Sequence, residues 1–504
     1  FTTLGDAPSC LTQAATNISN NGATLNGTVN PNHLSTVVTF EYGINTSYGS
    51  SATATQSPMT GNAILNANAA ITGLMPGTIY HFRIKTVNSI GTVYGEDLTF
   101  TTTGIAPAAI TNDATNVTGT TATLNGKVNA NSISTTVTFE YGTTTSYGNN
   151  VNASPGTVTG NAETGVSYNL TGLALGTTYH YRVRAQNSVG VTYGSDKSFT
   201  TPNKPTVTTV AITDKTYNSA VSGGTIVSDG GAAITAKGVC WNTTGSPTIS
   251  GSKTNEGAGN AAYVSNLTGL LPNTTYYIRA YATNSAGTGY GHTDSFITPP
   301  APVADIQGNI YSTVRIGDQI WMAEDLKVTK YRDGSDIPNV TGTTQWASLV
   351  SGAYCDLNND PEWSETYGKL YNFFVVLNNK GICPTGWHVP NDVEIATLIN
   401  YLGGPEVAGG KIKEVGFEHW ESPNTGATNL SGFTALGSGH RHWNGGFSYP
   451  KILFEMWLSN ERASRDGHRI GSTTGIWNNT QELPLPTNDG IYAEDGCSIR
   501  CIKD

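Results

Sequence analysis

Residues 78–83 read TIYHFR and residues 177–182 read TTYHYR, so one short pattern recurs 99 residues further along the chain. In a more diverged third copy, Tyr276 follows Tyr179 by 97 residues. Large apolar residues alternate with charged ones in these segments, which is typical of a strand with one face in a core and one in water. The repeat therefore predicts several similar β-modules in tandem over roughly the first 300 residues.

Further features of each copy indicate the kind of module. The segments 74–80 (LMPGTIY) and 270–276 (LLPNTTY) have the pattern of a tyrosine corner. Short strands at regular spacing, broken by Gly, Asn and Pro, are typical of a seven-stranded sandwich. With their closing Phe-Thr-Thr strands, the copies resemble bacterial fibronectin type III modules. The resemblance implies three immunoglobulin-like β-sandwiches, at 7–103, 104–201 and 202–300.

The composition of the 504-residue chain argues against several functional classes. Only 12% of the residues are charged, which disfavours a coiled coil or a charged disordered tail. The net charge of −10 disfavours nucleic-acid binding, since phosphates are bound by a clustered basic face. No stretch approaches the roughly 18 apolar residues of a membrane helix. We therefore expect neither a nucleic-acid partner nor a membrane span.

The last 200 residues differ in character from the repeats. Residues 303–504 hold 15 basic and 24 acidic residues, whereas residues 1–302 hold 11 basic and 12 acidic ones. Eight of the nine Trp also lie in 303–504. The change falls at the proline-rich segment 299–302. Within the second part, 314–327 predicts a hairpin turning at a Gly-Asp pair, and 391–402 predicts a helix with an N-terminal capping box.

Several runs in this part resemble the Fibrobacter-type major paralogous domain, known as FISUMP. They include 367–372 (YGKLYN), 383–390 (CPTGWHVP) and 500–504 (RCIKD), and the resemblance covers essentially 305–504. It implies an α+β domain of the C-type-lectin-like fold group, which we assign to 303–504. The predicted fold class is thus mostly β, with three sandwiches followed by this domain. The resemblance also implies a bacterial protein at the cell surface or outside the cell, exported with its signal peptide removed, and no established activity.

The late loops of the C-terminal domain are the expected ligand face. Loops on a rigid scaffold are where recognition concentrates, and aromatic and Arg side chains favour interfaces. The ligand contacts predicted on this basis are Arg441, Trp443, Phe447, Tyr449, Trp457, Arg462, Arg465 and Trp477. The alternative for Trp457 and Trp477 is that both belong to the core.

The six cysteines contain no Cys-x-x-Cys pair, which disfavours zinc fingers and thioredoxin-type redox chemistry. Disulfides are expected in an extracellular chain. The favoured pair is Cys383–Cys501, which ties the segment before the predicted helix to the final strand. A second pair, Cys355–Cys497, is a possibility that the sequence leaves open. The other two cysteines lie in separate sandwiches and are expected to be unpaired.

Metal and catalytic motifs are weak in this sequence. Asp356, Asn358 and Asp360 alternate as the ligands of calcium loops do, but an ordinary polar loop is the alternative, since the expected glycine and final glutamate are missing. His440 and His442 could share a strand face, yet no third ligand is visible near them. Nucleophile-elbow, P-loop and zinc-protease motifs are absent from the sequence. We therefore expect no enzyme and no cofactor other than this calcium candidate.

The N-terminal remnant 1–6 opens with Phe1-Thr2-Thr3, which duplicates the closing strand of the repeats. Either this segment marks a processed end of the chain, or the strand docks on a neighbouring subunit by β-augmentation. Two functions follow. The sandwiches could be spacers that present the C-terminal domain for adhesion or for binding a glycan or protein ligand. Alternatively, the chain could be the subunit of a self-assembling extracellular filament.

Overall fold

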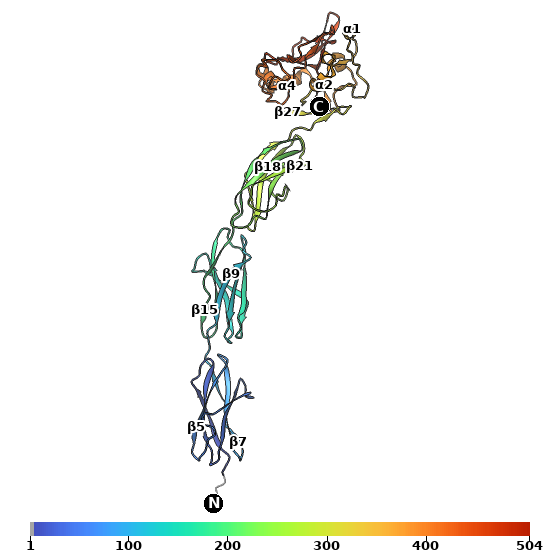
Figure 1. Ribbon diagram of the computed structural model, residues 1–504. Coiled ribbons are helices and arrows are strands. Elements are labelled where there is room, and N and C mark those ends of the chain that lie inside the picture. Colours follow the sequence, from blue (N-terminus) through green and yellow to red (C-terminus); the bar gives the residue numbers. More distant parts are fainter. Residues whose placement is uncertain (1–4) are drawn as a thin grey trace.

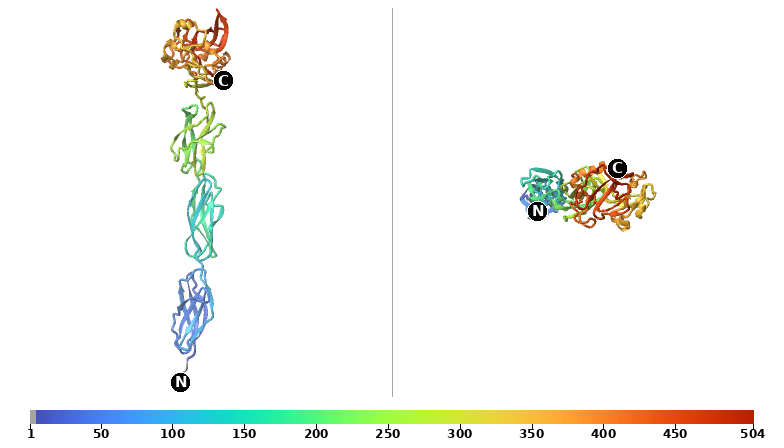
Figure 2. Two further views of the ribbon diagram at one scale, coloured as in Figure 1. Left: turned by 90° about the vertical axis from the view of Figure 1, so that its right-hand side faces the viewer. Right: turned by 90° about the horizontal axis from the view of Figure 1, so that it is seen from above.

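The computed structural model describes residues 5–504, in which three β-sandwiches follow one another end to end before a mixed C-terminal domain (Figure 1). Figure 2 shows the same extended row from another direction, with the C-terminal domain at the end opposite the N-terminus. The predicted class, mostly β with tandem immunoglobulin-like sandwiches, is confirmed. The predicted docking strand at Phe1, Thr2 and Thr3 lies outside the described residues. Among those residues, no helix is long and apolar enough to cross a membrane.

The first sandwich consists of β1 (Ser9–Thr16), β2 (Gly22–Asn30), β3 (Val37–Gly43), β4 (Ser50–Thr53), β5 (Leu65–Thr72), β6 (Ile79–Val87), β7 (Thr92–Tyr94) and β8 (Leu98–Thr101). One sheet has the order β1-β2-β5 and the other β4-β3-β6-β7, with β8 also paired to β6. Burial alternates along β6, where Tyr80, Phe82 and Ile84 face the core and the residues between them are half-buried. The predicted alternation is therefore confirmed.

The other two sandwiches repeat this plan. The second contains β9 (Ala108–Thr115), β10 (Ala122–Asn129), β11 (Thr135–Gly142), β12 (Asn149–Val158), β13 (Thr164–Leu170), β14 (Thr178–Gln186), β15 (Val191–Tyr193) and β16 (Lys197–Thr200). The third contains β17 (Thr206–Thr213), β18 (Ser219–Ser228), β19 (Ala236–Asn242), β20 (Ser252–Lys253), β21 (Tyr263–Thr268), β22 (Thr275–Asn284), β23 (Gly287–Tyr290) and β24 (Asp294–Ile297). In the second sandwich, β12 pairs with both β11 and β13 and so joins the two sheets at one edge.

The first and third sandwiches contain the predicted tyrosine corners, and the second sandwich contains one as well. The hydroxyl of Tyr80 accepts a hydrogen bond from the backbone N–H of Met75 at 3.0 Å. The equivalent hydroxyls of Tyr179 and Tyr276 accept such bonds at 3.1 and 2.9 Å. Each tyrosine thereby fixes the turn that leads into its own strand.

The C-terminal domain is built from short strands and helices. Its strands are β25 (Val303–Ala304), β26 (Ile310–Tyr311), β27 (Thr313–Ile316), β28 (Gln319–Met322), β29 (Tyr354–Cys355), β30 (Leu370–Asn372), β31 (Trp387–His388), β32 (His440–Arg441), β33 (Phe447–Ser448), β34 (Leu453–Arg465), β35 (His468–Trp477), β36 (Ile491–Tyr492), β37 (Gly496–Cys497) and β38 (Ile502–Lys503). Its helices are α1 (Thr343–Ala347), the 3-10 turn η1 (Leu357–Asn359), α2 (Pro361–Tyr367), α3 (Phe373–Val376), α4 (Asp392–Tyr401) and α5 (Pro405–Ile412). Apart from the two-stranded β25-β26 pair, three sheets result, in the orders β27-β28-β38-β31, β29-β30-β37-β32-β33 and β34-β35-β36.

Local sequence signals account for the predicted hairpin and helix. β27 and β28 pair antiparallel around Gly317, as predicted. The side chain of Asn391 accepts backbone N–H bonds at the start of α4, and the Glu394 carboxylate accepts the N–H of Asn391, which completes the predicted capping box. The buried face of α4 carries Ile395, Leu398 and Ile399.

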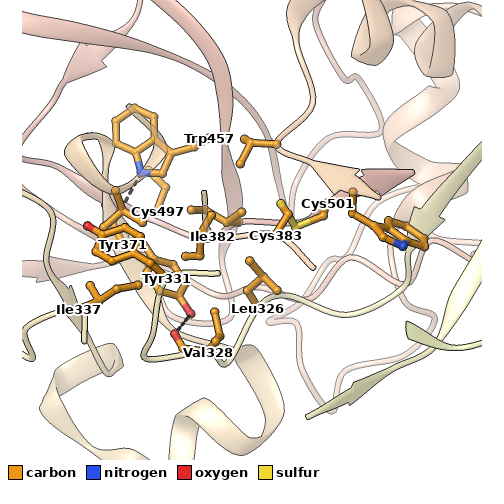
Figure 3. Close-up of a cluster of buried hydrophobic side chains, with 14 of the residues drawn as sticks. Leu326, Val328, Tyr331, Ile337, Tyr371, Ile382, Cys383, Trp457, Cys497 and Cys501 are labelled. Carbon is orange, nitrogen blue, oxygen red and sulfur yellow. Dashed lines mark hydrogen bonds between the residues drawn. A yellow bond between two sulfur atoms is a disulfide. The ribbon is translucent and has the colours of Figure 1, made fainter. Parts of the chain in front are cut away.

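A large cluster of buried hydrophobic side chains forms a core of this domain (Figure 3). The indole N–H of Trp457 donates to the Tyr371 carbonyl at 2.6 Å, and the Tyr371 hydroxyl donates to the Val328 carbonyl at 2.6 Å. The disulfide Cys383–Cys501 lies in the same core and joins residues 118 positions apart, so the favoured pairing is confirmed.

The second possible disulfide, Cys355–Cys497, is wrong. β30 lies between the strands that carry these residues, because Leu370 pairs with Cys355 and Tyr371 pairs with Cys497. Strands two positions apart in a sheet are separated by roughly 9–10 Å, whereas a disulfide needs Cα atoms within about 7 Å. Both thiols are buried and free, and the two cysteines of the sandwiches are free as well.

The calcium candidate gains no support either, because one oxygen of each of its two carboxylates already accepts hydrogen bonds from protein donors. Asp356 is buried and its carboxylate accepts hydrogen bonds from Ser364 and, at 2.7 Å, from the Lys369 ammonium. Asp360 caps α2 by accepting a backbone N–H. Asn358 lies between them in the 3-10 turn. These residues form an ordinary polar loop that starts a helix.

Candidate functional site

A cavity of about 340 Å³ opens on the C-terminal domain, and aromatic side chains form one wall of it. The rings pack edge to face in two pairs, with centroids 5.9 Å apart for Trp443 and Tyr492 and 4.9 Å apart for Tyr449 and Trp477. Trp443, Tyr449 and Trp477 keep 46%, 40% and 41% of their surface exposed. Substantial ring surface is therefore accessible to a ligand in the cavity.

Titratable side chains form the floor of the same cavity: His440, His442, Glu455 and Asp495. The Nδ1 atom of His440 lies 2.9 Å from Oε2 of Glu455, and its Nε2 atom lies 3.4 Å from Oδ1 of Asp495. The Nε2 atom of His442 lies 2.9 Å from the Ser448 hydroxyl. Because one ligand atom each from His440, His442 and Asp495 falls within 4.8 Å of the others, these three residues could hold a metal ion.

The Asp495 carboxylate connects the floor to the aromatic wall. Its Oδ1 atom accepts the backbone N–H of Trp443 at 2.6 Å, and its Oδ2 atom accepts the backbone N–H of Tyr492 at 2.9 Å. Glu455 is positioned similarly, since its Oε1 atom accepts the Thr473 hydroxyl at 3.0 Å. Both carboxylates are thus held in place by the strands and turns around the cavity.

The two histidines have opposite electrostatic surroundings. Burial disfavours the charged form of His440, but the hydrogen bonds and charges of Asp495 and Glu455 outweigh this and raise its pKa to about 9. Burial, and then the charge of His440, lower the pKa of His442. The Cys497 thiol lies 3.7 Å from Nδ1 of His440, and burial together with the nearby carboxylates raises its pKa well above the ordinary value. That thiol therefore stays protonated near neutral pH.

Strand alternation explains why one member of β32 faces the cavity and the next does not. His440 points into the cavity, so Arg441 points to the opposite side and is fully buried. The Arg441 guanidinium lies 4.1 Å from the ring centroid of Trp346 and 4.7 Å from that of Phe447, and it donates to the Val340 carbonyl at 2.6 Å. Arg441 and Phe447, which were predicted as ligand contacts, instead pack against each other away from the cavity.

Two further residues that were predicted as ligand contacts, Trp457 and Arg462, instead make contacts within the protein. Trp457 is fully buried, with its indole N–H bonded in the core, so the alternative of a core residue holds for it. Arg462 forms an ion pair with Asp392 at 2.7 Å and donates to the Ser472 hydroxyl at 2.7 Å. This pair ties β34 to the first residue of α4, and neither Trp457 nor Arg462 lines the cavity.

The remaining four predicted residues come together around one space. Trp443, Tyr449, Arg465 and Trp477 all line the cavity, although they are spread over 35 positions of the sequence. Arg465 stands at the end of β34, where its guanidinium lies 3.6 Å from the Asp489 carboxylate. Trp477 is half-exposed here and is not the core residue that the alternative proposed.

Among the lining residues that sequence reasoning missed, three have a carboxylate or an aromatic ring: Glu455, Tyr492 and Asp495. For Glu455 a signal existed, since it is the only acidic residue within the otherwise apolar run 453–458, and buried carboxylates need partners. Tyr492 and Asp495 come from the short segment around β36, about 50 residues after His440. No local pattern connects that segment to β32.

A larger cavity of about 620 Å³ lies where the third sandwich meets the C-terminal domain. The linker residues Pro299 and Pro300 line it, together with Asn273 and Arg315. Arg315 of the C-terminal domain donates to the Asn273 side chain of the third sandwich at 3.0 Å. This cavity is therefore formed where the two domains contact each other. Its lining contains no histidine or carboxylate, and the smaller cavity is therefore the better candidate site.

Comparison with known proteins supports the predicted family resemblance of the C-terminal domain. Residues 314–503 match the family described as the Fibrobacter succinogenes major domain. This match covers the whole cavity and leaves the three sandwiches outside it. No curated protein matches the chain.

Solved structures match the sandwich region. The crystal structure of chicken CNTN1 FN1-FN3 domains is 19% identical, covers 57% of this chain and 97% of its own, and gives a TM-score of 0.23. Domains A168-A170 from titin are 17% identical, cover 58% of this chain and 99% of their own, and give a TM-score of 0.26. At these TM-scores the matches carry no argument about function, and the sandwich assignment stands on the strand pairing itself.

Proposed function

We propose that this chain is an extracellular bacterial binding protein, in which three β-sandwich spacers carry a C-type-lectin-like C-terminal domain that binds a saccharide. The observation that carries the proposal is the cavity in which half-exposed aromatic rings face carboxylates and imidazoles. Binding cavities typically combine apolar walls with a few convergent polar groups in this way.

The two sides of the cavity suit the two kinds of surface on a sugar ring. A pyranose has an apolar C–H face that packs on an aromatic ring, and Trp443 and Trp477 offer such rings at the cavity wall. Its hydroxyl groups both donate and accept hydrogen bonds, and the floor offers carboxylate acceptors in Glu455 and Asp495. Arg465 adds a donor at the rim.

The arrangement favours recognition over turnover. Asp495 accepts two backbone N–H groups, and Glu455 accepts a threonine hydroxyl, while both carboxylates also contact His440. Carboxylates bound in this way hold the shape of the cavity.

The surfaces of the sandwiches support a spacer role. On the first sandwich, the Arg83 guanidinium lies between the rings of Tyr48 and Tyr94, at 4.7 and 3.9 Å, and is paired with Glu41 at 2.8 Å. The second sandwich repeats the same cluster around Arg182. In these two modules, the charges around Arg83 and Arg182 are therefore paired within the module. The filament alternative depends on Phe1–Thr3, outside the described residues, and stays a prediction.

A saccharide array probed with the full-length chain tests the proposal, followed by calorimetric titration of the best binder. Trp477→Ala should weaken that binding about tenfold or more, since loss of a buried aromatic contact at a binding site typically costs over 1 kcal/mol. Phe417→Ala is the matched control, because Phe417 is 64% exposed in the same domain but does not line the cavity. An array without binders, or equal affinities for the two variants, would contradict the proposal.

A further inference from the structure

The floor of the cavity brings together three metal-ligating side chains from distant parts of the C-terminal domain. His440 lies in β32 and His442 directly follows that strand, and their ring centroids are 4.7 Å apart. Asp495 joins them from the turn between β36 and β37. One ligand atom from each residue lies within 4.8 Å of the other two. We propose that His440, His442 and Asp495 bind a divalent transition-metal ion of the Zn²⁺ type.

Two of these ligands form a long hydrogen bond whose spacing also suits a metal site. His440 Nε2 and Asp495 Oδ1 are 3.4 Å apart, beyond the usual N–H···O distance of about 2.9 Å. In a tetrahedral zinc site with bonds of roughly 2.0–2.1 Å, neighbouring ligand atoms are separated by about 3.3 Å. The third ligand, His442, needs only a side-chain adjustment, because its ring is held by a single hydrogen bond to Ser448.

The second ring nitrogen of His440 has the partner that metal-binding histidines usually have. Its Nδ1 atom lies 2.9 Å from the Glu455 carboxylate, which in turn is held by the Thr473 hydroxyl. A carboxylate in this position keeps the proton on Nδ1, so a metal ion displaces the proton of Nε2 and binds its lone pair. Glu455 is therefore a positioning residue and not a ligand of this site.

The charges at the floor also favour a cation. Glu455 and Asp495 together carry two negative charges, and protonated His440 offsets one of them in the metal-free protein. A divalent ion that displaces the Nε2 proton of His440 balances both charges. The nearest guanidinium on the cavity wall, Arg465, has Asp489 as its own partner at 3.6 Å. A metal ion at the floor would thus neutralise carboxylates that the rest of the cavity leaves without a full countercharge.

The geometry also selects between two overlapping groups of ligands. His440, Glu455 and Cys497 lie equally close together, but they meet on the Nδ1 side of His440, and Cys497 does not line the cavity. The proposed group meets on the Nε2 side, and all three of its members line the cavity. Its fourth coordination position therefore faces the open space, where water or an oxygen atom of a ligand can bind.

This inference does not depend on the proposed saccharide binding, and it can be tested without any saccharide. Untagged full-length protein, stripped with a chelator, is titrated with Co²⁺ while visible absorption is recorded, and then with Zn²⁺ by calorimetry. We expect one equivalent to bind, with the intense visible bands of tetrahedral Co²⁺ and without the near-ultraviolet band of a thiolate ligand. A thiolate band would instead assign the metal to the Cys497 side and overturn the proposed ligand set.

Variants separate a built site from incidental binding. His442→Ala should weaken Zn²⁺ binding at least 100-fold, and Glu455→Gln should weaken it 10–100-fold, as expected for a positioning carboxylate. His419→Ala is the matched control, because His419 pairs with the Glu414 carboxylate at 2.8 Å in the same domain but away from this cavity. Thermal unfolding checks that each variant is folded. Absence of stoichiometric binding by the unmodified chain, or equal affinities of His442→Ala and His419→Ala, would overturn the proposal.

Discussion

The Oδ1 atom of Asp495 lies 3.4 Å from Nε2 of His440 and also accepts the backbone N–H of Trp443 at 2.6 Å. A single buried carboxylate thus joins the proposed metal site to the aromatic wall of the cavity. Its other oxygen accepts the N–H of Tyr492. The position of Asp495 therefore sets both the spacing of the floor and the orientation of two rings.

The first prediction concerns this carboxylate. Asp495→Asn keeps the size of the side chain but removes its charge and one acceptor, so we expect a loss of about 1–3 kcal/mol in the free energy of unfolding of the C-terminal domain. This loss in the free energy of unfolding is measured by urea unfolding, with Trp fluorescence as the signal. Asp489→Asn is the control, because that side chain is 89% exposed and should change stability by less than about 0.5 kcal/mol. Equal stabilities of the two variants would be the contrary result.

The disulfide gives the second prediction. Cys383 and Cys501 close a loop of 118 residues, so replacing both with Ser should lower the stability of the C-terminal domain by about 2–5 kcal/mol. Scanning calorimetry of the full chain should show one transition moving to lower temperature while the transitions of the sandwiches stay in place. Cys10→Ala, which changes a free thiol of the first sandwich, should leave the C-terminal transition unchanged. A C-terminal transition that stays in place in the double variant would show that the disulfide adds no stability.

The tyrosine corners give the third prediction. Tyr80→Phe keeps the stacking on Phe100 but removes the hydroxyl that accepts the Met75 N–H. One lost hydrogen bond should destabilise the turn by about 0.5–1.5 kcal/mol. Hydrogen exchange read by mass spectrometry should be faster in the peptide that spans 74–80 and unchanged in the matching peptide around Tyr179. If both peptides exchange as in the unmodified chain, the corner does not stabilise the sandwich.

Features that depend on neighbours in the sequence could be predicted from it. The capping box of Asn391 and Glu394, the hairpin at Gly317 and the tyrosine corners each need only a few adjacent residues. The repeat was equally informative, because its three copies independently report the same strand pattern. These elements fix most of the sandwich fold.

The candidate site could be predicted only in part, because burial and long-range pairing decide it. Trp457 and Trp477 look alike in the sequence, yet the first lies in the middle of a strand covered on both faces and the second at the end of a strand. Arg441 is buried because its neighbour His440 faces the cavity. Asp495 lies near the histidines because β37, which follows it, is the neighbour of β32 in the sheet. No local sequence pattern predicts that strand order.

The fourth prediction concerns pH. His388 is hydrogen-bonded to Asp504 at 2.6 Å and to Glu394 at 2.8 Å. Burial opposes its charged form, but these two carboxylates outweigh that effect and raise its pKa above 6.5. A raised pKa in the folded state means that the stabilisation is fully present below the unfolded value of about 6.5 and is lost as the pH rises through the folded value.

The stability difference between the unmodified chain and His388→Gln should therefore be largest near pH 6 and shrink as the pH is raised above the folded pKa. Urea unfolding of both proteins at several pH values measures this difference. His33→Gln, a change in the first sandwich, should show no such pH-dependent difference in the C-terminal transition. A stability difference between the unmodified chain and His388→Gln that is constant with pH, or that increases as the pH rises, would contradict the assigned role of the two carboxylates.

Ligand recognition in the aromatic cavity of the C-terminal domain is tested by comparing the dissociation constants of Trp477→Ala and Phe417→Ala. Both are measured by calorimetry on full-length protein with the best saccharide from the array. The Trp477 variant should bind about tenfold or more weakly than the Phe417 variant. Equal dissociation constants would show that the protein recognises its ligand elsewhere.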